Sequence, residues 1–252
     1  MKLYKPEISA RRNKFAVKFF DFAFKRLLEK NFYAVRVKNK HNFYLRDENY
    51  SNILYGTHSC WWDGILAAFI FRNLYDCNFH IMIKDLYRFT SLAYAGGFSV
   101  EKHAFRGSLT AINYSIKLLE NPANSLWIFP QGNIMPSNSI PIKFESGIAH
   151  ICKKLDGVNL IPIVHQYLFL RNEKPEIFVE IGKPIIVKGG INDKKEFLLF
   201  IQGEFEKLLQ AQKAELAKGK YEGYECILHN DQTWLRMMET NFKPLLRAKL
   251  RN

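Results

Sequence analysis

The sequence predicts an α/β fold, a single domain whose mostly buried mixed sheet is flanked by helices. Three observations predict it. The chain has 252 residues, 48% of them hydrophobic, which is enough to bury a sizeable core. Short apolar runs alternate with longer helix-like stretches over much of the chain, a pattern typical of α/β domains. Prolines cluster around the end of one apolar run, which predicts a long loop after Phe129.

The expected elements follow one another in a regular order. The apolar runs that predict buried strands are Asn52–Tyr55, Phe79–Ile83, Leu126–Phe129, Leu160–Val164 and Ile177–Ile181. The stretches that predict helices between them are Trp62–Tyr75, Ser108–Leu119 and Glu145–Leu155, and a further helix is predicted over Asp193–Lys218. Loops at strand ends are where α/β folds usually place their chemistry.

We expect three regions along the chain: an N-terminal amphipathic helix region (1–41), an α/β core (42–190) and a helical C-terminal extension (191–252). In the first, apolar residues recur at three- and four-residue steps, which predicts a helix over about Ile8–Asn31. Basic residues fill its other positions, so this helix either lies at a membrane surface or docks on the protein's own core. The same two alternatives stay open for the tail from Tyr221.

The chain is strongly basic. It carries 37 Lys and Arg against 24 Asp and Glu, a net charge of +13. This balance favours a polyanionic partner, namely nucleic acid, anionic lipid headgroups or a phosphorylated small molecule. The basic residues are spread rather than striped and form no recognisable nucleic-acid-binding motif. We therefore expect a membrane surface with anionic lipid as the partner, and no nucleic acid.

Targeting and redox signals are sparse. No segment reaches the roughly 18 uncharged apolar residues of a membrane span, and charges recur from Arg11 to Arg26, which argues against a signal peptide. The 4 cysteines form no CxxC pair, so neither a disulfide framework nor a metal site is expected. A reducing cytosol fits this pattern. The expected location is cytoplasmic, peripheral on the membrane.

The segment Gly56–Gly64 carries the most chemical information. A strand ends near Tyr55, a turn of small residues presents His58, and a helix beginning near Trp62 places Asp63 in its first turn. A carboxylate at that position is favoured by the helix N-terminus and stays ionised. It can accept a hydrogen bond from one imidazole nitrogen and leave the other free as a general base. His58 and Asp63 thus correspond to the base and the orienting carboxylate of a catalytic triad, in an arrangement that does not require a protein nucleophile.

Other interpretations of this segment remain open. His80 and Asp85 repeat the same spacing, but an offset of five residues in a strand points the two side chains to opposite faces. His80 is therefore predicted to be structural. Ser59 or Cys60, beside His58, is an alternative nucleophile for a hydrolase, although the chain has no Gly-x-Ser-x-Gly elbow.

The aromatic residues near the histidine segment have two possible roles, packing and substrate binding. The paired Trp61 and Trp62 are expected to pack the helix onto the sheet, with the lining of a substrate channel as the alternative. Phe98 and Phe129 are expected to have the same packing role.

Four blocks together resemble the glycerolipid (lysophospholipid) acyltransferase family, which includes the 1-acylglycerol-3-phosphate O-acyltransferases. They occur in the family's order between about Asn52 and Val187, more than half of the chain. The blocks are His58-x4-Asp63, Gly97–Lys102 with Arg106, Phe129–Asn133, and Ile161-Pro162-Ile163. The combination is far more specific than any one block.

The resemblance implies an O-acyltransferase whose catalytic dyad is His58 and Asp63. His58 would take the proton of an acceptor hydroxyl while the oxygen attacks an acyl thioester, and backbone N–H groups near Gly132 are candidates for stabilising the oxyanion. Acyl-CoA or acyl carrier protein would be the donor, a lysolipid or glycerolipid-like molecule the acceptor, and no cofactor or metal would be needed. The implied substrate-binding residues are Lys84, Lys102, Arg106, Phe129, Pro130, Gln131, Gly132 and Asn133.

Two positions depart from the family's pattern. Gln131 stands where the family has Glu, and Ile134 stands where an Arg is usual. Gln131 keeps the hydrogen-bonding shape without the charge, whereas Ile134 offers no bidentate contact to phosphate. An acceptor without phosphate (a lyso-aminolipid, a glycolipid or a carotenoid glycoside) therefore stays open beside a phosphorylated one. A non-catalytic lipid-binding relative is a further alternative, which the presence of both dyad residues disfavours.

Overall fold

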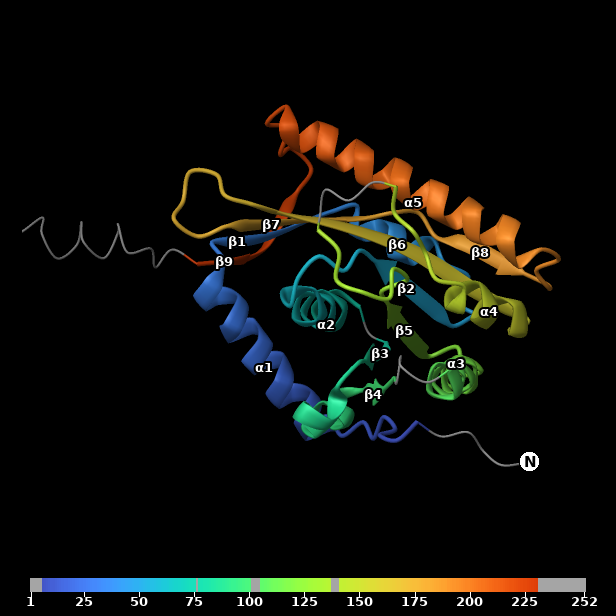
Figure 1. Cartoon of the computed structure of the whole chain (residues 1–252). Coiled ribbons are helices and arrows are strands. Elements are labelled where there is room, and N and C mark those ends of the chain that lie inside the picture. Colours follow the sequence, from blue (N-terminus) through green and yellow to red (C-terminus); the bar gives the residue numbers. More distant parts are fainter. Residues whose placement is uncertain (1–5, 76, 101–104, 137–140, 231–252) are drawn as a thin grey trace, which may run out of the picture.

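The computed structural model of the chain describes residues 6–75, 77–100, 105–136 and 141–230. In this part, nine strands form one sheet with helices on both faces, so the predicted α/β class is confirmed (Figure 1). The helices are α1 (Lys14–Asn31), α2 (Trp62–Leu74), α3 (Phe105–Leu119), α4 (Gly147–Lys154) and α5 (Lys194–Ala217). Two 3-10 segments, η1 (Lys40–Leu45) and η2 (Leu86–Ala95), each connect one strand to the next.

The sheet is mixed, with the main strand order β4-β3-β5-β2-β6-β7-β1-β9 and β8 paired to β6. The strands are β1 (Ala34–Lys38), β2 (Asn52–Gly56), β3 (Asn78–Ile83), β4 (Gly97–Ser99), β5 (Asn124–Ile128), β6 (Gly157–Leu168), β7 (Glu176–Ile181), β8 (Ile185–Lys188) and β9 (Glu225–His229). The block from β4 to β6 is parallel, whereas β7 and β8 run antiparallel to β6. The carboxyl ends of β2 and β5 therefore meet at one edge of the sheet.

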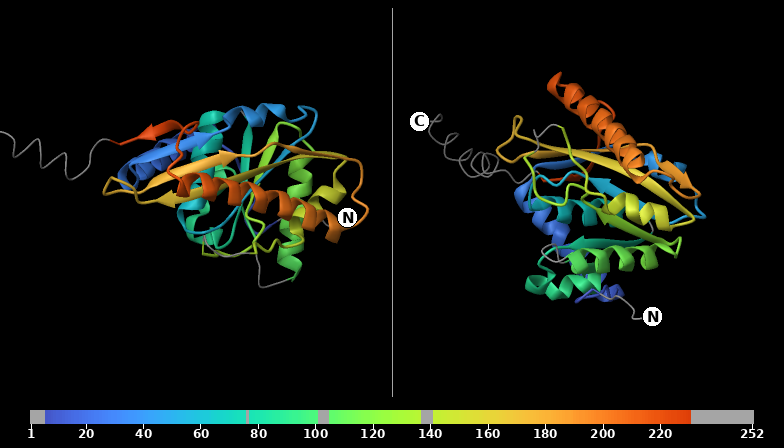
Figure 2. Two further views of the ribbon diagram at one scale, coloured as in Figure 1. Left: turned by 90° about the horizontal axis from the view of Figure 1, so that it is seen from above. Right: turned by 45° about the vertical axis from the view of Figure 1, so that its right-hand side comes forward.

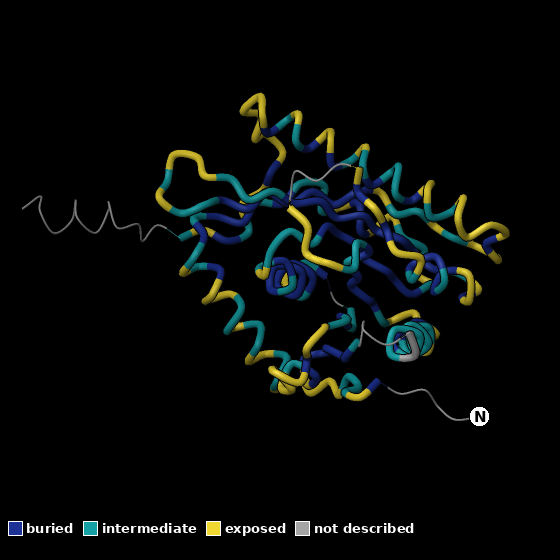
Figure 3. Tube along the Cα trace, viewed as in Figure 1, coloured by how far each residue is buried: buried dark blue, intermediate teal, exposed yellow. Residues whose placement is uncertain are grey.

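Helices cover both faces of the sheet and create two cores (Figure 2). Side chains alternate along β2, so Leu54 packs with α1 and α2 on one face, while Ile53 and Tyr55 pack with α3, α4 and α5 on the other. Figure 3 shows the sheet and α2 as buried, with exposed turns along α1 and α5. The site therefore lies on a rigid, doubly covered framework.

The expected strands and helices are all present, with ends shifted by a few residues. The sheet also contains elements outside the expected core of residues 42–190. β1 lies within the expected N-terminal region, pairs in parallel with β7, and pairs antiparallel with β9 from the expected helical extension. The C-terminal extension is therefore helical only in part, because α5 is followed by a strand that joins the sheet. The tail after residue 230 lies outside the described residues.

The helix α1 begins at Lys14 rather than near Ile8, because Asn13 caps it by accepting from the backbone N–H groups of Phe15 and Ala16. Before it, an extended segment binds the sheet, where the N–H of Ile8 donates to Ser99 Oγ at 2.9 Å. Docking on the protein's own core is observed for part of the helix, where Leu28 is buried.

The other side of α1 stays exposed. Phe15 (84%), Phe19 (65%) and Phe22 (61%) point to solvent. No helix in the described ranges is long and apolar enough to cross a membrane.

Candidate active site

The loop between β2 and α2 presents the predicted dyad at the carboxyl end of β2. The strand ends at Gly56, where a Cβ atom would lie 3.0 Å from the Ile163 carbonyl oxygen and 3.1 Å from the Trp127 ring. This tight packing favours glycine at the position. The chain then turns at residues 57–61 and enters α2 at Trp62, so Asp63 lies in the first turn of the helix as predicted.

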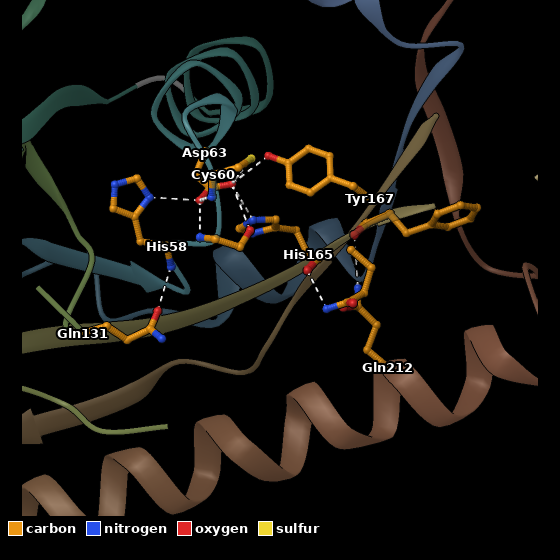
Figure 4. A network of polar contacts seen from close by, with 10 residues as sticks. His58, Cys60, Asp63, Gln131, His165, Tyr167 and Gln212 are labelled. Atoms are coloured by element: carbon orange, nitrogen blue, oxygen red, sulfur yellow. Dashed lines mark hydrogen bonds and ion pairs between the residues drawn. The ribbon is translucent and has the colours of Figure 1, made fainter. Parts of the chain in front are cut away.

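His58 and Asp63 contact one another directly (Figure 4). The His58 Nδ1 atom lies 2.9 Å from Asp63 Oδ2. The carboxylate is buried, whereas the His58 side chain retains 23% of its surface exposed. The imidazole stacks on Phe129, with ring centroids 4.2 Å apart and planes inclined by 14°. Because a carboxylate only accepts, His58 donates from Nδ1, and Nε2 is the nitrogen left to accept a proton.

The loop also wraps its own backbone around the carboxylate. The N–H groups of Ser59 and Cys60 donate to Asp63 Oδ2 at 2.5 and 2.8 Å. Both N–H groups belong to the turn just before the N-cap Trp61, and the acidic residue in the first turn of the helix accepts from them. The same contacts fix the position of the loop that carries His58.

Two residues that the sequence did not single out complete the surroundings of Asp63. His165 Nε2 lies 2.9 Å from Asp63 Oδ1, and the Tyr167 hydroxyl donates to the same oxygen at 2.7 Å. Both side chains come from β6 (Figure 4). The available signal was their spacing of two residues, which puts them on one face of a strand just after the Ile161-Pro162-Ile163 block.

These contacts set the protonation states at the site. Burial raises the pKa of Asp63, but the hydrogen bonds from His165 and His58 outweigh it and hold the pKa well below its ordinary value, so Asp63 is ionised at neutral pH. Burial, followed by the charge of Asp63, raises the pKa of Tyr167, which is therefore a neutral donor.

The same two effects raise the pKa of the Cys60 thiol. A thiol kept protonated is a poor nucleophile, which disfavours the acyl-enzyme alternative.

The loop after β5 holds His58 from the other side. Gln131 Oε1 accepts from the backbone N–H of His58 at 2.7 Å, and the N–H of Met135 donates to the His58 carbonyl oxygen at 2.8 Å. Gln131 thus supplies an acceptor oxygen that a carboxylate at this position would also supply. The N–H of Gly132, a candidate oxyanion donor from the sequence, instead donates to the Phe129 carbonyl oxygen at 3.0 Å.

The remaining predicted binding residues are dispersed. Pro130 is buried beside Gln131, whereas Asn133 and Lys84 are exposed. Lys102 lies outside the described residues, and Arg106 falls in the first turn of α3 with a side chain outside the described part. The structure therefore unites Phe129, Gln131 and the dyad.

A cavity of about 400 Å³ is lined by four residues that contact Asp63, namely Ser59, Cys60, His165 and Tyr167; His58 and Asp63 themselves are not among its described lining residues. Aromatic rings dominate its lining, with Phe32 and Trp62 packed edge to face at 5.0 Å. The expected packing role is thus confirmed for Trp62, which also lines the cavity, but is wrong for Trp61, which is 62% exposed. The polar lining groups are two neutral amides, two hydroxyls, a thiol and His165, and no Lys, Arg, Asp or Glu is among the described lining residues.

The described residues hold no cluster of three or more His, Cys, Asp or Glu side chains suited to a metal ion. The groups that the site brings together are the imidazole, its buried carboxylate and the neutral donors around them. An imidazole held by one nitrogen on a buried, ionised carboxylate is the arrangement of a general base.

The chain matches the family model described as Acyltransferase over residues 34–166, just over half of its length. It belongs to this family and is an acyltransferase. Among solved structures it resembles the 1-acyl-sn-glycerophosphate (LPA) acyltransferase PlsC of Thermotoga maritima, with 17% identity, a TM-score of 0.57, and coverage of 80% of this chain and 82% of that chain. At this identity the likeness shows a shared fold. A comparison with curated proteins gave no match.

Proposed function

We propose that the protein transfers a fatty acyl group from an acyl thioester, either acyl-CoA or acyl carrier protein, to a hydroxyl of a lysolipid or glycerolipid-like acceptor. The observation that carries this proposal is the 2.9 Å contact between His58 Nδ1 and a buried, ionised Asp63. Membership of the acyltransferase family and the fold shared with an LPA acyltransferase support it.

In the proposed reaction, the acceptor hydroxyl gives its proton to His58 Nε2 while its oxygen attacks the thioester carbonyl. The tetrahedral intermediate then collapses, the C–S bond breaks, and the leaving thiolate takes the proton from the imidazolium. Asp63 holds the ring in the required tautomer and stabilises its positive charge during the transfer. General-base assistance of this kind contributes about 100- to 10,000-fold to the rate.

The loop after β5 favours an acceptor with a neutral head. Ile134, where the family's pattern has Arg, is 55% exposed near the site, and an isoleucine forms no hydrogen bond to phosphate. The aromatic cavity lined by residues that contact Asp63 has no Lys, Arg, Asp or Glu among its described lining residues. We therefore rank a phosphate-free lysolipid or glycolipid above lysophosphatidic acid as the acceptor.

A donor and acceptor panel tests the function. The purified protein is mixed with acyl-CoA or acyl carrier protein thioesters and with matched acceptors that do or do not carry phosphate. We expect free thiol and acylated acceptor to form in equal amounts, and kcat/KM to be higher for a phosphate-free acceptor. Higher kcat/KM for lysophosphatidic acid would overturn the acceptor ranking. Thiol release without acylated acceptor would show a hydrolase and overturn the proposed function.

We also propose that the enzyme works peripherally on the cytoplasmic face of a membrane that contains anionic lipid, through one side of α1. The exposed Phe15, Phe19 and Phe22 follow one another at helical spacing, and Arg26 lies over the Phe22 ring at 5.4 Å. The exposed rings of Tyr87 and Phe89 belong to η2, which contacts α1. Exposed aromatic residues with adjacent cations are typical of a surface that inserts among anionic headgroups.

Replacing Phe15, Phe19 and Phe22 together by Ser is expected to weaken binding to phosphatidylglycerol-containing vesicles by about tenfold or more, because three apolar side chains no longer leave water. Vesicle sedimentation measures the effect. The matched control is Leu199→Ser with Phe200→Ser on α5, two residues that are 59% and 51% exposed. Equal losses in the two variants, or none in the first, would contradict the assignment of α1.

A further inference from the structure

A second histidine shares the carboxylate of the dyad. Asp63 accepts from His58, Ser59 and Cys60 on Oδ2, and from His165 and Tyr167 on Oδ1 (Figure 4). We propose that His165 and Tyr167 are positioning residues, which hold Asp63 so that Oδ2 stays on His58 Nδ1 and which share the charge of its carboxylate. This inference rests on the proposed function, because it assigns roles within that reaction.

The register of the sheet explains why β6 reaches the dyad. β2 and β6 are parallel, with Tyr55 opposite Pro162 and Gly56 opposite Ile163. β2 ends there, but β6 continues to Leu168. His165 and Tyr167 therefore lie beyond the end of β2, beside the loop that carries His58. Tyr167 is outside the residues that match the family and His165 is near their end, so the family match does not point to this pair.

Packing holds both side chains in place. His165 is 4% exposed, and its ring meets the Tyr167 ring edge to face at 5.4 Å. Tyr167 in turn packs against Phe32 at the end of α1, with ring centroids 5.7 Å apart. Neither donor can leave Asp63 without disturbing buried aromatic contacts. A positioning group needs this kind of support from its surroundings.

The donors restrict the rotation of the carboxylate. Both oxygens of the carboxylate are held: His58 and the backbone N–H groups of the loop donate to Oδ2, whereas the two side chains of β6 donate to Oδ1. Turning the Asp63 carboxylate would break contacts on both sides at once. Without His165 and Tyr167, only the Ser59 hydroxyl at 3.5 Å and the Cys60 thiol at 3.4 Å would remain on Oδ1. The carboxylate could then turn and move Oδ2 away from His58, and the imidazole would lose the partner that fixes its tautomer.

The donors on Oδ1 also draw negative charge away from Oδ2. His165 has to donate through its Nε2–H, because an ionised carboxylate only accepts. Without these two bonds, more of the charge of Asp63 would face His58 and would favour the protonated imidazole. The groups that face Asp63 from the neighbouring elements are His58, Ser59 and Cys60 from the loop, and His165 and Tyr167 from β6.

Three variants test the proposal. Tyr167→Phe removes one hydroxyl, His165→Leu removes one imidazole donor, and His165→Gln restores an N–H near the position of Nε2. We expect Tyr167→Phe and His165→Leu each to lower kcat by about tenfold, the effect of one hydrogen bond to a charged group, with KM changed by less than about twofold. In both, the acidic limb of the pH–rate profile should move to higher pH. His165→Gln should recover most of kcat.

Tyr55→Phe is the matched control. Tyr55 is a fully buried tyrosine on β2, and its hydroxyl has no hydrogen-bond partner among the described residues. Like Tyr167→Phe, this variant loses a tyrosine hydroxyl from the sheet, but it does not affect Asp63. Its kcat and pH profile should therefore equal those of the parent. A loss equal to that of Tyr167→Phe would mean that the effect is one of packing, and would overturn the positioning role.

Nitrogen-15 NMR of the histidine rings gives a readout that needs no turnover. In the parent, His58 should show one tautomer with the proton on Nδ1, and in Tyr167→Phe and His165→Leu a mixture of tautomers. His58→Ala assigns the signal.

Parental kcat, pH profile and His58 signal in both variants, alongside an inactive His58→Ala protein, would overturn the positioning role and leave the proposed function standing. A fully active His58→Ala protein would overturn the proposed function. The His58 ring signals of the parent and of the Tyr167 and His165 variants would still test whether these two residues hold Asp63. If His165→Leu fails to fold, Tyr167→Phe and His165→Gln carry the same comparison.

Discussion

Replacing His58 by Ala is expected to lower kcat by about 100- to 10,000-fold or more, because the acceptor hydroxyl then has no base to receive its proton. The fold should survive, since the His58 ring is partly exposed and contributes one stacking contact with Phe129. The measurement is single-turnover acyl transfer with saturating donor and acceptor, together with a thermal unfolding curve. A parental rate in a folded His58→Ala protein would show that this imidazole is not the base.

His80→Gln is the natural control for this experiment. His80 has the same sequence spacing to Asp85 as His58 has to Asp63, but it is buried on β3, and its partner in the motif lies in the turn that precedes η2. Burial lowers the pKa of His80 to about 4, so it is neutral at physiological pH. Activity should stay near that of the parent, because the position of the imidazole and not the spacing of the motif determines catalysis.

Asp63→Asn should also have a large effect, a loss of about 1,000- to 10,000-fold in kcat. An amide cannot accept on both sides. With its NH₂ group toward the loop, His58 would lose the acceptor that fixes its tautomer; with its NH₂ group toward β6, His165 and Tyr167 would lose their acceptor. The expected cost in the free energy of unfolding is about 3 kcal/mol. Steady-state kinetics and urea unfolding measure the two effects separately.

The pH dependence of stability provides a check on Asp63→Asn. The pKa of Asp63 is lowered in the folded protein, so the folded state binds the proton less tightly than the unfolded state. Its contribution to stability is therefore complete above about pH 4 and declines as the pH falls further. The stability difference between parent and variant should shrink in acid. A difference that is constant from pH 7 to pH 3 would argue that Asp63 is not ionised in the folded protein.

The dyad could be predicted from sequence because its geometry is local. His58 and Asp63 lie five residues apart across a strand end and a helix start, and the preference of a helix N-terminus for a carboxylate is sufficient to bring them together. The buried strands were predictable for a similar reason, since each is a short run of apolar residues. Gln131 was predicted at the site through the family's pattern, and the structure adds that its side chain holds the His58 backbone.

The rest depended on pairings that no local pattern contains. β1 was missed because Arg36 and Lys38 interrupt its apolar residues, and these charges meet Glu176 and Glu180 on β7, a strand about 140 residues further along. His165 and Tyr167 were missed because a histidine and a tyrosine on a strand are usually packing residues. Only the register of β6 against β2 brings them to Asp63.

The pairing of β1 with two late strands has a consequence for synthesis on the ribosome. β1 is made early, but its neighbours are residues 176–181 and 225–229. The nascent chain therefore carries an unsatisfied strand until most of the polypeptide has emerged, and such strands invite association with other chains. Arg36 and Lys38 place two cations on that strand during the interval. Before they form ion pairs with β7, these two charges therefore protect the unpaired strand against aggregation.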